Sequence, residues 1–112
     1  MTVGDEIVVF ITAPNEDEAD GIAKALVESK LAACVNIIKG IRSIYIWRGA
    51  LESDSEVLMI AKTQRALFDA LSDKTKELHS YDVPEIIAVP ISLGSEDYLK
   101  WVRESTEIKR EE

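Results

Sequence analysis

The stretch ACVNIIKGIRSIYIWRGALESDSEVLMIAKT, residues 33–63, decides how this chain folds. Its first half, residues 33–47, is rich in the β-branched and aromatic residues that favour strands, and Gly40 interrupts it. Residues 48–51 supply a turn, after which residues 52–63 return as a second strand. The stretch therefore predicts a β-hairpin with arms of about 12 to 15 residues, against a usual strand length of about 5 to 6.

Such a hairpin is too long for a compact body built from 112 residues. An arm of about 15 residues reaches about 50 Å, whereas a globular domain of this size spans about 34 Å. The hairpin must therefore bend sharply, at Gly40, or project beyond the body. A projecting hairpin would expose Tyr45, Trp47 and unpaired strand edges, and pairing with other copies of the chain would cover them. We therefore expect an oligomer.

The residues before the hairpin predict one strand and one helix. Residues 7–12 are dominated by Ile, Val and Phe, which is typical of a buried central strand. Asn15 can then cap a helix over about residues 16–29, and Glu18 completes the pattern of a capping box. The apolar residues of this helix recur at helical spacing and form one stripe: Ala19, Ile22, Ala23, Leu26 and Val27.

Two more helices and one strand are expected after the hairpin. Thr63 can cap the first of these helices, and Pro84 begins a strand that ends at Pro90. Ser95 can cap the second, short helix, and residues 109–112 are expected to fray. The buried sides predicted for the two helices are Leu67, Phe68, Leu71 and Leu78, and then Tyr98, Trp101 and Val102.

The order of elements predicts an α+β fold of the ferredoxin-like type, β-α-β-β-α-β with an extra C-terminal helix, in a single domain over residues 1–112. Two crossover helices would cover one face of an antiparallel four-stranded sheet.

The overall charge argues against nucleic acid as a partner. The 21 acidic and 13 basic residues give a formal net charge of −8, which repels phosphate groups and weakly attracts cations. No apolar run approaches the roughly 18 residues of a membrane span, so we expect no membrane insertion. Residues 1–6 lack the basic region that opens a secretory signal, and we expect a cytoplasmic protein. The single cysteine, Cys34, is expected to be buried as a small hydrophobe.

Four segments of the chain carry a resemblance to a known family: Leu31–Ile37, Ser43–Gly49 together with Glu56 and Lys62, His79–Ile86, and Tyr98–Trp101. Taken together, they resemble the CutA divalent-cation tolerance family over nearly the whole chain. The resemblance implies a ferredoxin-like subunit in a tightly packed homotrimer whose long hairpins pair between subunits. It also implies a role in tolerance to copper and other divalent metal ions, with no cofactor required.

His79 is the one histidine of the chain and the candidate metal ligand. Its imidazole could bind copper or another divalent ion weakly, or it could be a surface group that interacts with the carboxyl end of a helix. The resemblance implies that copper-binding relatives use a first-strand cysteine and a histidine pair. Those positions are Ile11 and Leu78–His79 here, so that particular site is not expected.

The sequence does not indicate an enzyme. A Ser-His-Asp triad would have to use His79, and no Gly-x-Ser-x-Gly motif accompanies it. The five glycines are scattered and form no phosphate-binding loop.

A further candidate site is an inter-subunit cleft. Lys62, Tyr81 and Glu85 would form it, with Tyr45 and Trp47 contributed by a neighbour's hairpin. These groups could bind a small anion or metabolite, or they could satisfy one another across the interface. Two functions therefore stay open: a trimeric metal-tolerance protein, and a trimeric signalling or scaffold protein that resembles the PII regulators in build and binds a ligand or partner protein in its clefts.

Overall fold

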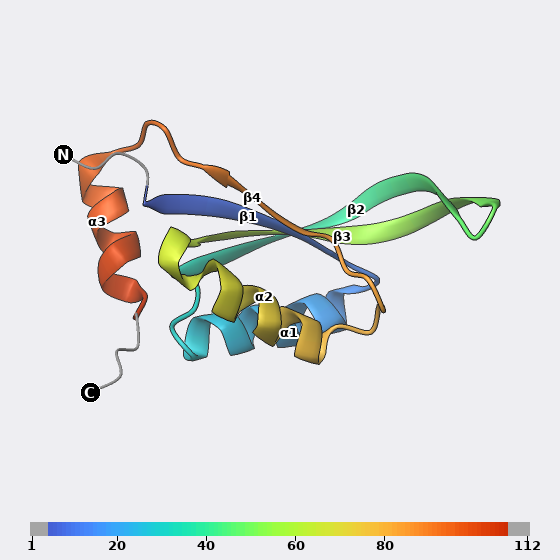
Figure 1. The fold of residues 1–112 in the computed structure, drawn as a ribbon, viewed down its shortest axis with the longest axis horizontal. Helices are drawn as coiled ribbons and strands as arrows, with labels where there is room; N and C mark the ends of the chain where they lie inside the picture. Colours follow the sequence, from blue (N-terminus) through green and yellow to red (C-terminus); the bar gives the residue numbers. More distant parts are fainter. Residues whose placement is uncertain (1–4, 108–112) are drawn as a thin grey trace.

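The computed structural model of the chain describes residues 5–107, and its strands form one antiparallel sheet in the order β2-β3-β1-β4 (Figure 1). This order confirms the predicted ferredoxin-like arrangement. The predicted frayed tail, residues 109–112, lies outside the described residues. The strands are β1 (Glu6–Ala13), β2 (Cys34–Trp47), β3 (Ala50–Gln64) and β4 (Ile86–Pro90).

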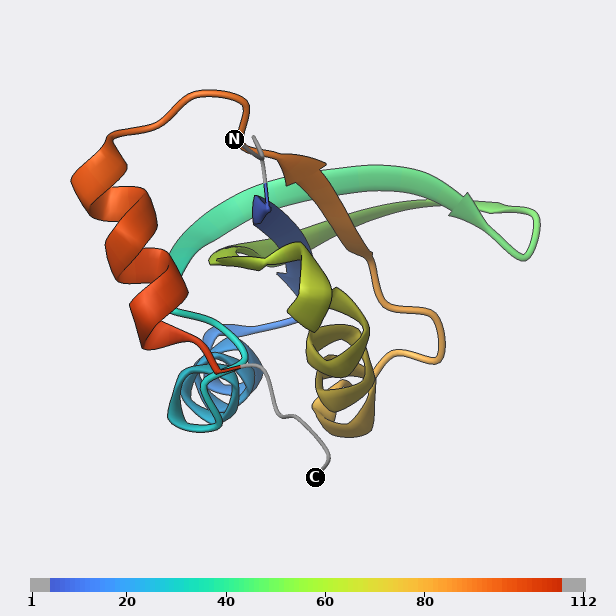
Figure 2. The same cartoon turned by 60° about the vertical axis from the view of Figure 1, so that its left-hand side comes forward.

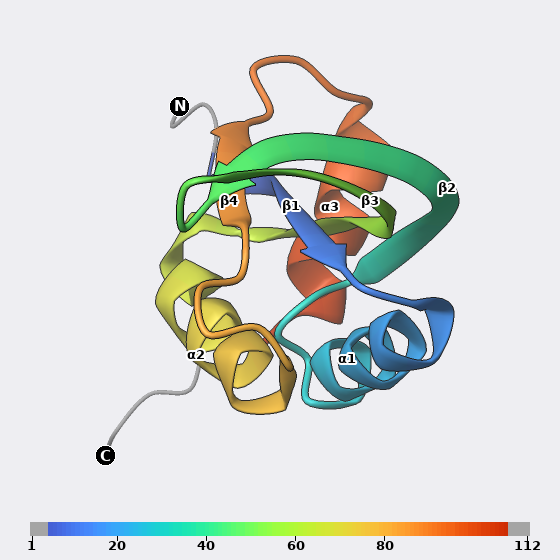
Figure 3. The same cartoon turned by 90° about the vertical axis from the view of Figure 1, so that its right-hand side faces the viewer.

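Two helices cover one face of the sheet, as predicted. α1 (Glu16–Glu28) and α2 (Phe68–Leu78) lie side by side beneath it (Figure 3). A short 3₁₀ helix, Arg65–Leu67, leads from β3 into α2. No helix among residues 5–107 has the length and apolar character needed to cross a membrane. The core between the helices and the sheet includes Val9, Ile11, Leu26, Met59 and Leu71, which are fully buried.

The third helix, α3 (Glu96–Ser105), stands at the end of the sheet opposite the hairpin tip (Figure 1). Two polar contacts fix it there. Gln64 Nε2 donates to Thr106 Oγ1 over 2.7 Å, and Arg103 Nη1 lies 3.2 Å from Glu6 Oε2. Ser95 caps α3 as predicted, because its Oγ accepts from the backbone N–H of Tyr98.

The hairpin bends and also projects beyond the body. Both of the alternatives expected from its length therefore occur. A bulge between Lys39 and Ile41 shifts the β2–β3 register, and Gly40 takes a positive φ of 82° there. The turn at the tip is two residues long, with φ of 50° at Arg48 and 82° at Gly49, as in a type I′ turn. The molecule measures 47 × 31 × 23 Å because the curved hairpin extends well beyond the body (Figure 2).

Two predicted helix starts differ from the structure in their polar contacts. Asn15 caps α1 as expected, with its Oδ1 accepting from the backbone N–H of Glu18 over 2.8 Å. The capping box is wrong, because the Glu18 carboxylate instead accepts from Ser80. The predicted cap at Thr63 is also wrong, since β3 continues through this residue and its Oγ1 donates to the carbonyl of Leu31.

Several apolar residues predicted to be buried are exposed in the single subunit. Val102 is fully buried as predicted, but Tyr98 and Trp101 are 41% and 44% exposed. Leu78 is exposed too, because Leu71 and Thr75 form the buried side of α2. In the single subunit, each of these helices therefore buries only part of its row of apolar residues.

The sheet face that α1 and α2 leave uncovered, called here the open face, is largely apolar. Side chains alternate between the two faces of a strand, and directly paired residues share a face. Val9, Ile11 and Ala13 therefore face the helices, whereas their neighbours face outward. The apolar residues of the open face are half-buried or exposed: Val8, Phe10, Ile38, Leu58, Ile60, Ile87 and Val89.

Gly21 offers a simple test of the α1 backbone. It lies exposed inside the helix, and a Cβ added there would meet nothing within 4 Å. We expect Gly21→Ala to raise the free energy of unfolding by about 0.5 to 1 kcal/mol, because alanine restricts the unfolded chain. Urea unfolding at a fixed protein concentration measures this. Gly49→Ala adds the same atoms at a positive φ and should lower stability instead.

Candidate functional site

A cavity of about 750 Å³ lies at the base of the projecting hairpin. β1 ends at Ala13, opposite Val57, so the hairpin continues beyond this point without β1 beside it. The loop of residues 79–85, between α2 and β4, folds against the hairpin there (Figure 1). We call this space the hairpin cavity. Its lining includes Ser43, Tyr45, Trp47 and Glu56 from the hairpin, and Tyr81 and Glu85 from the loop.

The structure brings four of the five predicted cleft residues together. Tyr45, Trp47, Tyr81 and Glu85 all line the hairpin cavity within a single subunit, whereas a neighbour's hairpin was expected to supply the first two. Lys62 is not among them. Its Nζ contacts Asn36 Oδ1, on the adjacent strand β2.

Two tyrosines of the cavity donate hydrogen bonds to carboxylates of β3. The hydroxyl of Tyr81 donates to Glu56 Oε2 over 2.8 Å, and that of Tyr45 donates to Asp54 Oδ2. Glu56 is only 7% exposed, so its charge lies mostly out of solvent. These contacts tie the loop and the two hairpin strands to one another around the cavity.

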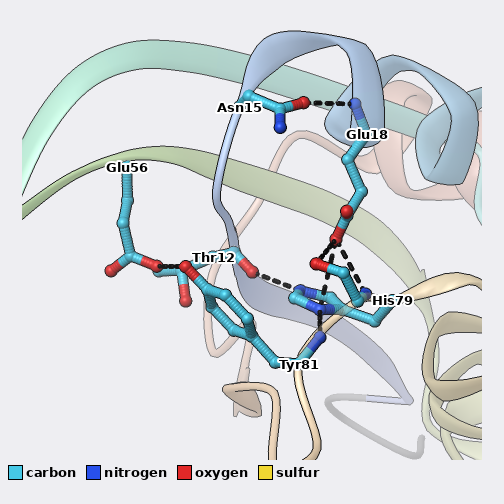
Figure 4. Close-up of polar contacts among 7 residues, drawn as sticks. Thr12, Asn15, Glu18, Glu56, His79 and Tyr81 are labelled. Atoms are coloured by element: carbon cyan, nitrogen blue, oxygen red, sulfur yellow. Dashed lines mark hydrogen bonds and ion pairs between the residues drawn. The ribbon is translucent and has the colours of Figure 1, made fainter.

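His79 ties the loop to the end of β1 (Figure 4). Its side chain is fully buried, and its Nε2 donates to the carbonyl of Thr12 over 2.7 Å. Its Nδ1 accepts from the backbone N–H of Tyr81 over 3.1 Å and lies 3.3 Å from Glu18 Oε2. The same carboxylate oxygen accepts from both the N–H and the hydroxyl of Ser80. His79 therefore fixes the backbone that carries Tyr81.

This setting bears on both interpretations of His79. It is not a surface group at a helix end, because it is buried. A metal ion could bind either ring nitrogen only after a hydrogen bond to Thr12 or Tyr81 breaks. Among residues 5–107, no group of three or more His, Cys, Asp or Glu side chains is placed to hold a metal ion.

Cys34 is half-buried and not buried as predicted. It lies on the open face of β2, directly opposite Lys62 of β3 and away from the hairpin cavity.

Sequence reasoning missed two residues of the site, Glu56 and Glu18. Glu56 is buried in a strand, and its one local signal is an acidic residue directly before the apolar run Val57–Ala61. The sequence indicated that Glu18 is a capping residue of α1. Its partner in the structure, Ser80, is 62 residues away in the chain. Contacts of that kind cannot be seen in local sequence.

The carboxylates of the hairpin raise the pKa of its tyrosines. The hydrogen bond to Asp54, with smaller contributions from burial and nearby acids, raises the pKa of Tyr45 to about 12. Burial, then the hydrogen bond to Glu56, raises the pKa of Tyr81. Burial and the nearby Cys34 also raise the pKa of Tyr98.

We therefore expect all three tyrosines to ionise above their ordinary pKa of about 10. Because the folded pKa is raised, the stability these phenols add is complete below about pH 10 and is lost as the pH rises through the folded pKa values. Tyrosinate absorbance during an alkaline titration measures this. Titration of any of the three near pH 10 in the folded protein would contradict it, and Tyr81→Phe should remove one of the late transitions.

Known proteins match the chain over nearly its whole length. The family described as CutA1 divalent ion tolerance protein matches residues 7–105. "Divalent-cation tolerance protein CutA" of Thermus thermophilus is 52% identical over 101 residues, which cover 90% of this chain and 98% of the relative. "Protein CutA" of Homo sapiens is 52% identical over 104 residues, 93% of this chain. The chain spans just over half the length of the human relative, 58%.

Solved structures agree with these sequence matches. The CutA1 structure from Thermus thermophilus superimposes with a TM-score of 0.89 at 52% identity, covering 91% of this chain and 99% of that one. The CutA1 structure from Oryza sativa gives a TM-score of 0.92 at 45% identity, covering 97% and 100%. The fold and the sequence match together, and the chain belongs to the CutA1 divalent ion tolerance protein family.

Proposed function

We propose that this protein is a homotrimeric divalent-cation tolerance protein that binds metal ions weakly and is not an enzyme. Membership of the CutA1 family supports the link to divalent cations. The net charge of −8 supports weak attraction of cations to the surface. His79, the one histidine of the chain, bonds through its ring nitrogens to the carbonyl of Thr12 and the N–H of Tyr81, so it is not paired with a serine or cysteine nucleophile.

The main support for the proposed trimer is the apolar open face. Ile38, Ile87 and Val89 are 45%, 54% and 46% exposed on it, in a row of residues that α1 and α2 leave bare. Contiguous apolar surface of this kind marks an interaction site in a soluble protein. Three copies, the number implied by the resemblance to the CutA family, could bury their open faces together. The free edges of the projecting hairpins would then pair between subunits.

Equilibrium dialysis with Cu²⁺ tests the cation link. Binding through surface carboxylates should be weak, and it should fall as salt rises from about 0.01 to about 0.15 M, because the Debye length shortens from about 30 to about 8 Å. The variant His79→Asn tests whether the imidazole binds Cu²⁺. If Cu²⁺ binding is lost, His79 is a ligand; if binding is unchanged, surface carboxylates bind the ion. No Cu²⁺ binding at low salt would contradict the proposal.

A second function is a trimeric scaffold or signalling protein that binds a small ligand or a partner in its clefts. The hairpin cavity favours it, because its volume of about 750 Å³ falls within the range of small-molecule sites. Native mass spectrometry of the purified protein, followed by thermal melting with each retained compound, tests this function. A clean mass spectrum and no ligand-dependent shift of the melting midpoint would count against it.

A further inference from the structure

The hairpin cavity carries negative charge and no positive group of its own. Glu56, Asp82 and Glu85 line it, and none of its lining residues is Lys, Arg or His, as far as residues 5–107 are concerned. Lys62, which the sequence placed in this site, contacts Asn36 instead. Because Lys62 lies outside the cavity, the site that was expected to attract an anion repels one. The electrostatic field of its carboxylates favours a cation.

Glu56 has an oxygen left for a ligand. The side chain is 7% exposed, and Oε2 accepts from the hydroxyl of Tyr81. The other oxygen, Oε1, has no hydrogen-bond partner within the described part of the chain, and it points away from Tyr81 (Figure 4). No buried side-chain oxygen of residues 5–107 lacks a partner, so Oε1 is open to solvent, and there a positively charged donor can bond to it more strongly than a neutral one.

Aromatic rings supply the second element of the site. Tyr45, Trp47 and Tyr81 line the same cavity as Glu56. Aromatic faces attract cations through their quadrupole, and Trp attracts them best. The chain already shows this at the hairpin tip, where the guanidinium carbon of Arg48 lies 5.5 Å from the centroid of the Trp47 ring.

An inorganic divalent ion does not suit this arrangement. Such ions need several oxygen ligands at about 2.0 to 2.6 Å, and no group of three acidic, histidine or cysteine side chains is so placed in residues 5–107. An organic ammonium needs less, since one carboxylate can accept its hydrogen bond while aromatic faces cover its carbon atoms.

We propose that the hairpin cavity binds a small organic cation, an alkyl amine or guanidine, with Glu56 as its counter-ion and Tyr45, Trp47 and Tyr81 as its walls. This inference rests on the second proposed function, a ligand-binding cleft, and names the chemical class of the ligand. Asp82 and Glu85, which are exposed residues of the cavity lining, attract the cation toward Glu56.

Three probes of similar length and different charge test the proposal by calorimetry on the intact protein. They are 1,5-diaminopentane, 1,5-pentanediol and glutarate. We expect saturable binding of the diamine alone, weakened by salt. Preferential binding of glutarate would overturn the inferred charge of the ligand but leave the ligand-binding cleft. Binding of none of the three would overturn the inference, and an absence of retained metabolites and melting shifts would separately remove the cleft.

Matched variants place the diamine in the cavity. Glu56→Gln keeps the shape and an acceptor for Tyr81, and should weaken binding about tenfold or more, because it removes a charge-assisted hydrogen bond. Glu28→Gln makes the same charge change on the exposed end of α1 and should leave binding unaltered. If Glu56→Gln fails to fold, Asp82→Asn combined with Glu85→Gln should still weaken binding severalfold. Equal diamine affinity in the folded cavity variants and Glu28→Gln would overturn the site.

Discussion

Ile87→Lys is expected to dissociate the proposed trimer into single folded subunits. Ile87 lies on the open face of β4, paired with Phe10, and it is 54% exposed in the isolated subunit. A lysine there leaves the core between the sheet and the two helices α1 and α2 unaltered. In the proposed trimer, however, it would place an unpaired ammonium in an apolar contact in each of three copies, at a cost of several kcal/mol each. Sedimentation should report the mass of one subunit, and the melting midpoint should fall by more than about 10 °C.

Val27→Lys is the matched control for this experiment. Val27 is 41% exposed on α1, away from the open face, and the same substitution there should leave the assembly intact. A trimeric mass for Ile87→Lys would contradict the assignment of the open face as the interface. A monomeric mass for the unaltered protein would contradict the trimer itself.

The sequence predicts the architecture well because periodicity reports on burial. Residues 7–12 and 16–29 were expected to form a strand and a helix, and β1 and α1 occupy Glu6–Ala13 and Glu16–Glu28. The hairpin arms follow from runs of strand-forming residues on either side of a turn. The turn was expected over residues 48–51, but β3 already begins at Ala50. Each of these predictions depends on residues that are close together in the chain, where local preference and packing agree.

The sequence predicts the site less well because its contacts join distant segments. His79 meets Thr12 across 67 residues, and Tyr81 meets Glu56 across 25. Nothing near His79 in the chain indicates that it is buried. The same limit explains Lys62: its residue type suggested an anion site, but its position on β3, opposite Cys34 of β2, takes it away from the hairpin cavity.

The bulge at Gly40 decides which residues of β2 reach the hairpin cavity. Before it, Ile38 pairs with Leu58; after it, Ile41 pairs with Glu56. The extra residue therefore exchanges odd and even positions, and it turns Tyr45 to the face of β3 that carries Glu56. In a regular strand, Gly40 would stand opposite Glu56, and Tyr45 would point to the other face.

Gly40→Val is therefore expected to disrupt both the hairpin and the cavity. The φ of 82° is strained for a β-branched residue, at a cost of about 1 to 3 kcal/mol in the free energy of unfolding. A regular strand relieves this strain, but it turns Tyr45 away from Asp54. The pKa of Tyr45 should then fall from about 12 toward its ordinary value near 10, which the tyrosinate titration measures.

Deletion of Gly40 separates the two effects of that substitution. Without Gly40, Ile41 follows Lys39 directly and can still stand opposite Glu56, so Tyr45 and Trp47 keep their face. The deletion should straighten the hairpin yet leave the pKa of Tyr45 raised and the cavity lined as before. Equal titrations for Gly40→Val and the unaltered protein would contradict the role of the bulge. So would an ordinary Tyr45 pKa in the deletion variant, because the pairing of β2 with β3 would then not determine which side chains face the cavity.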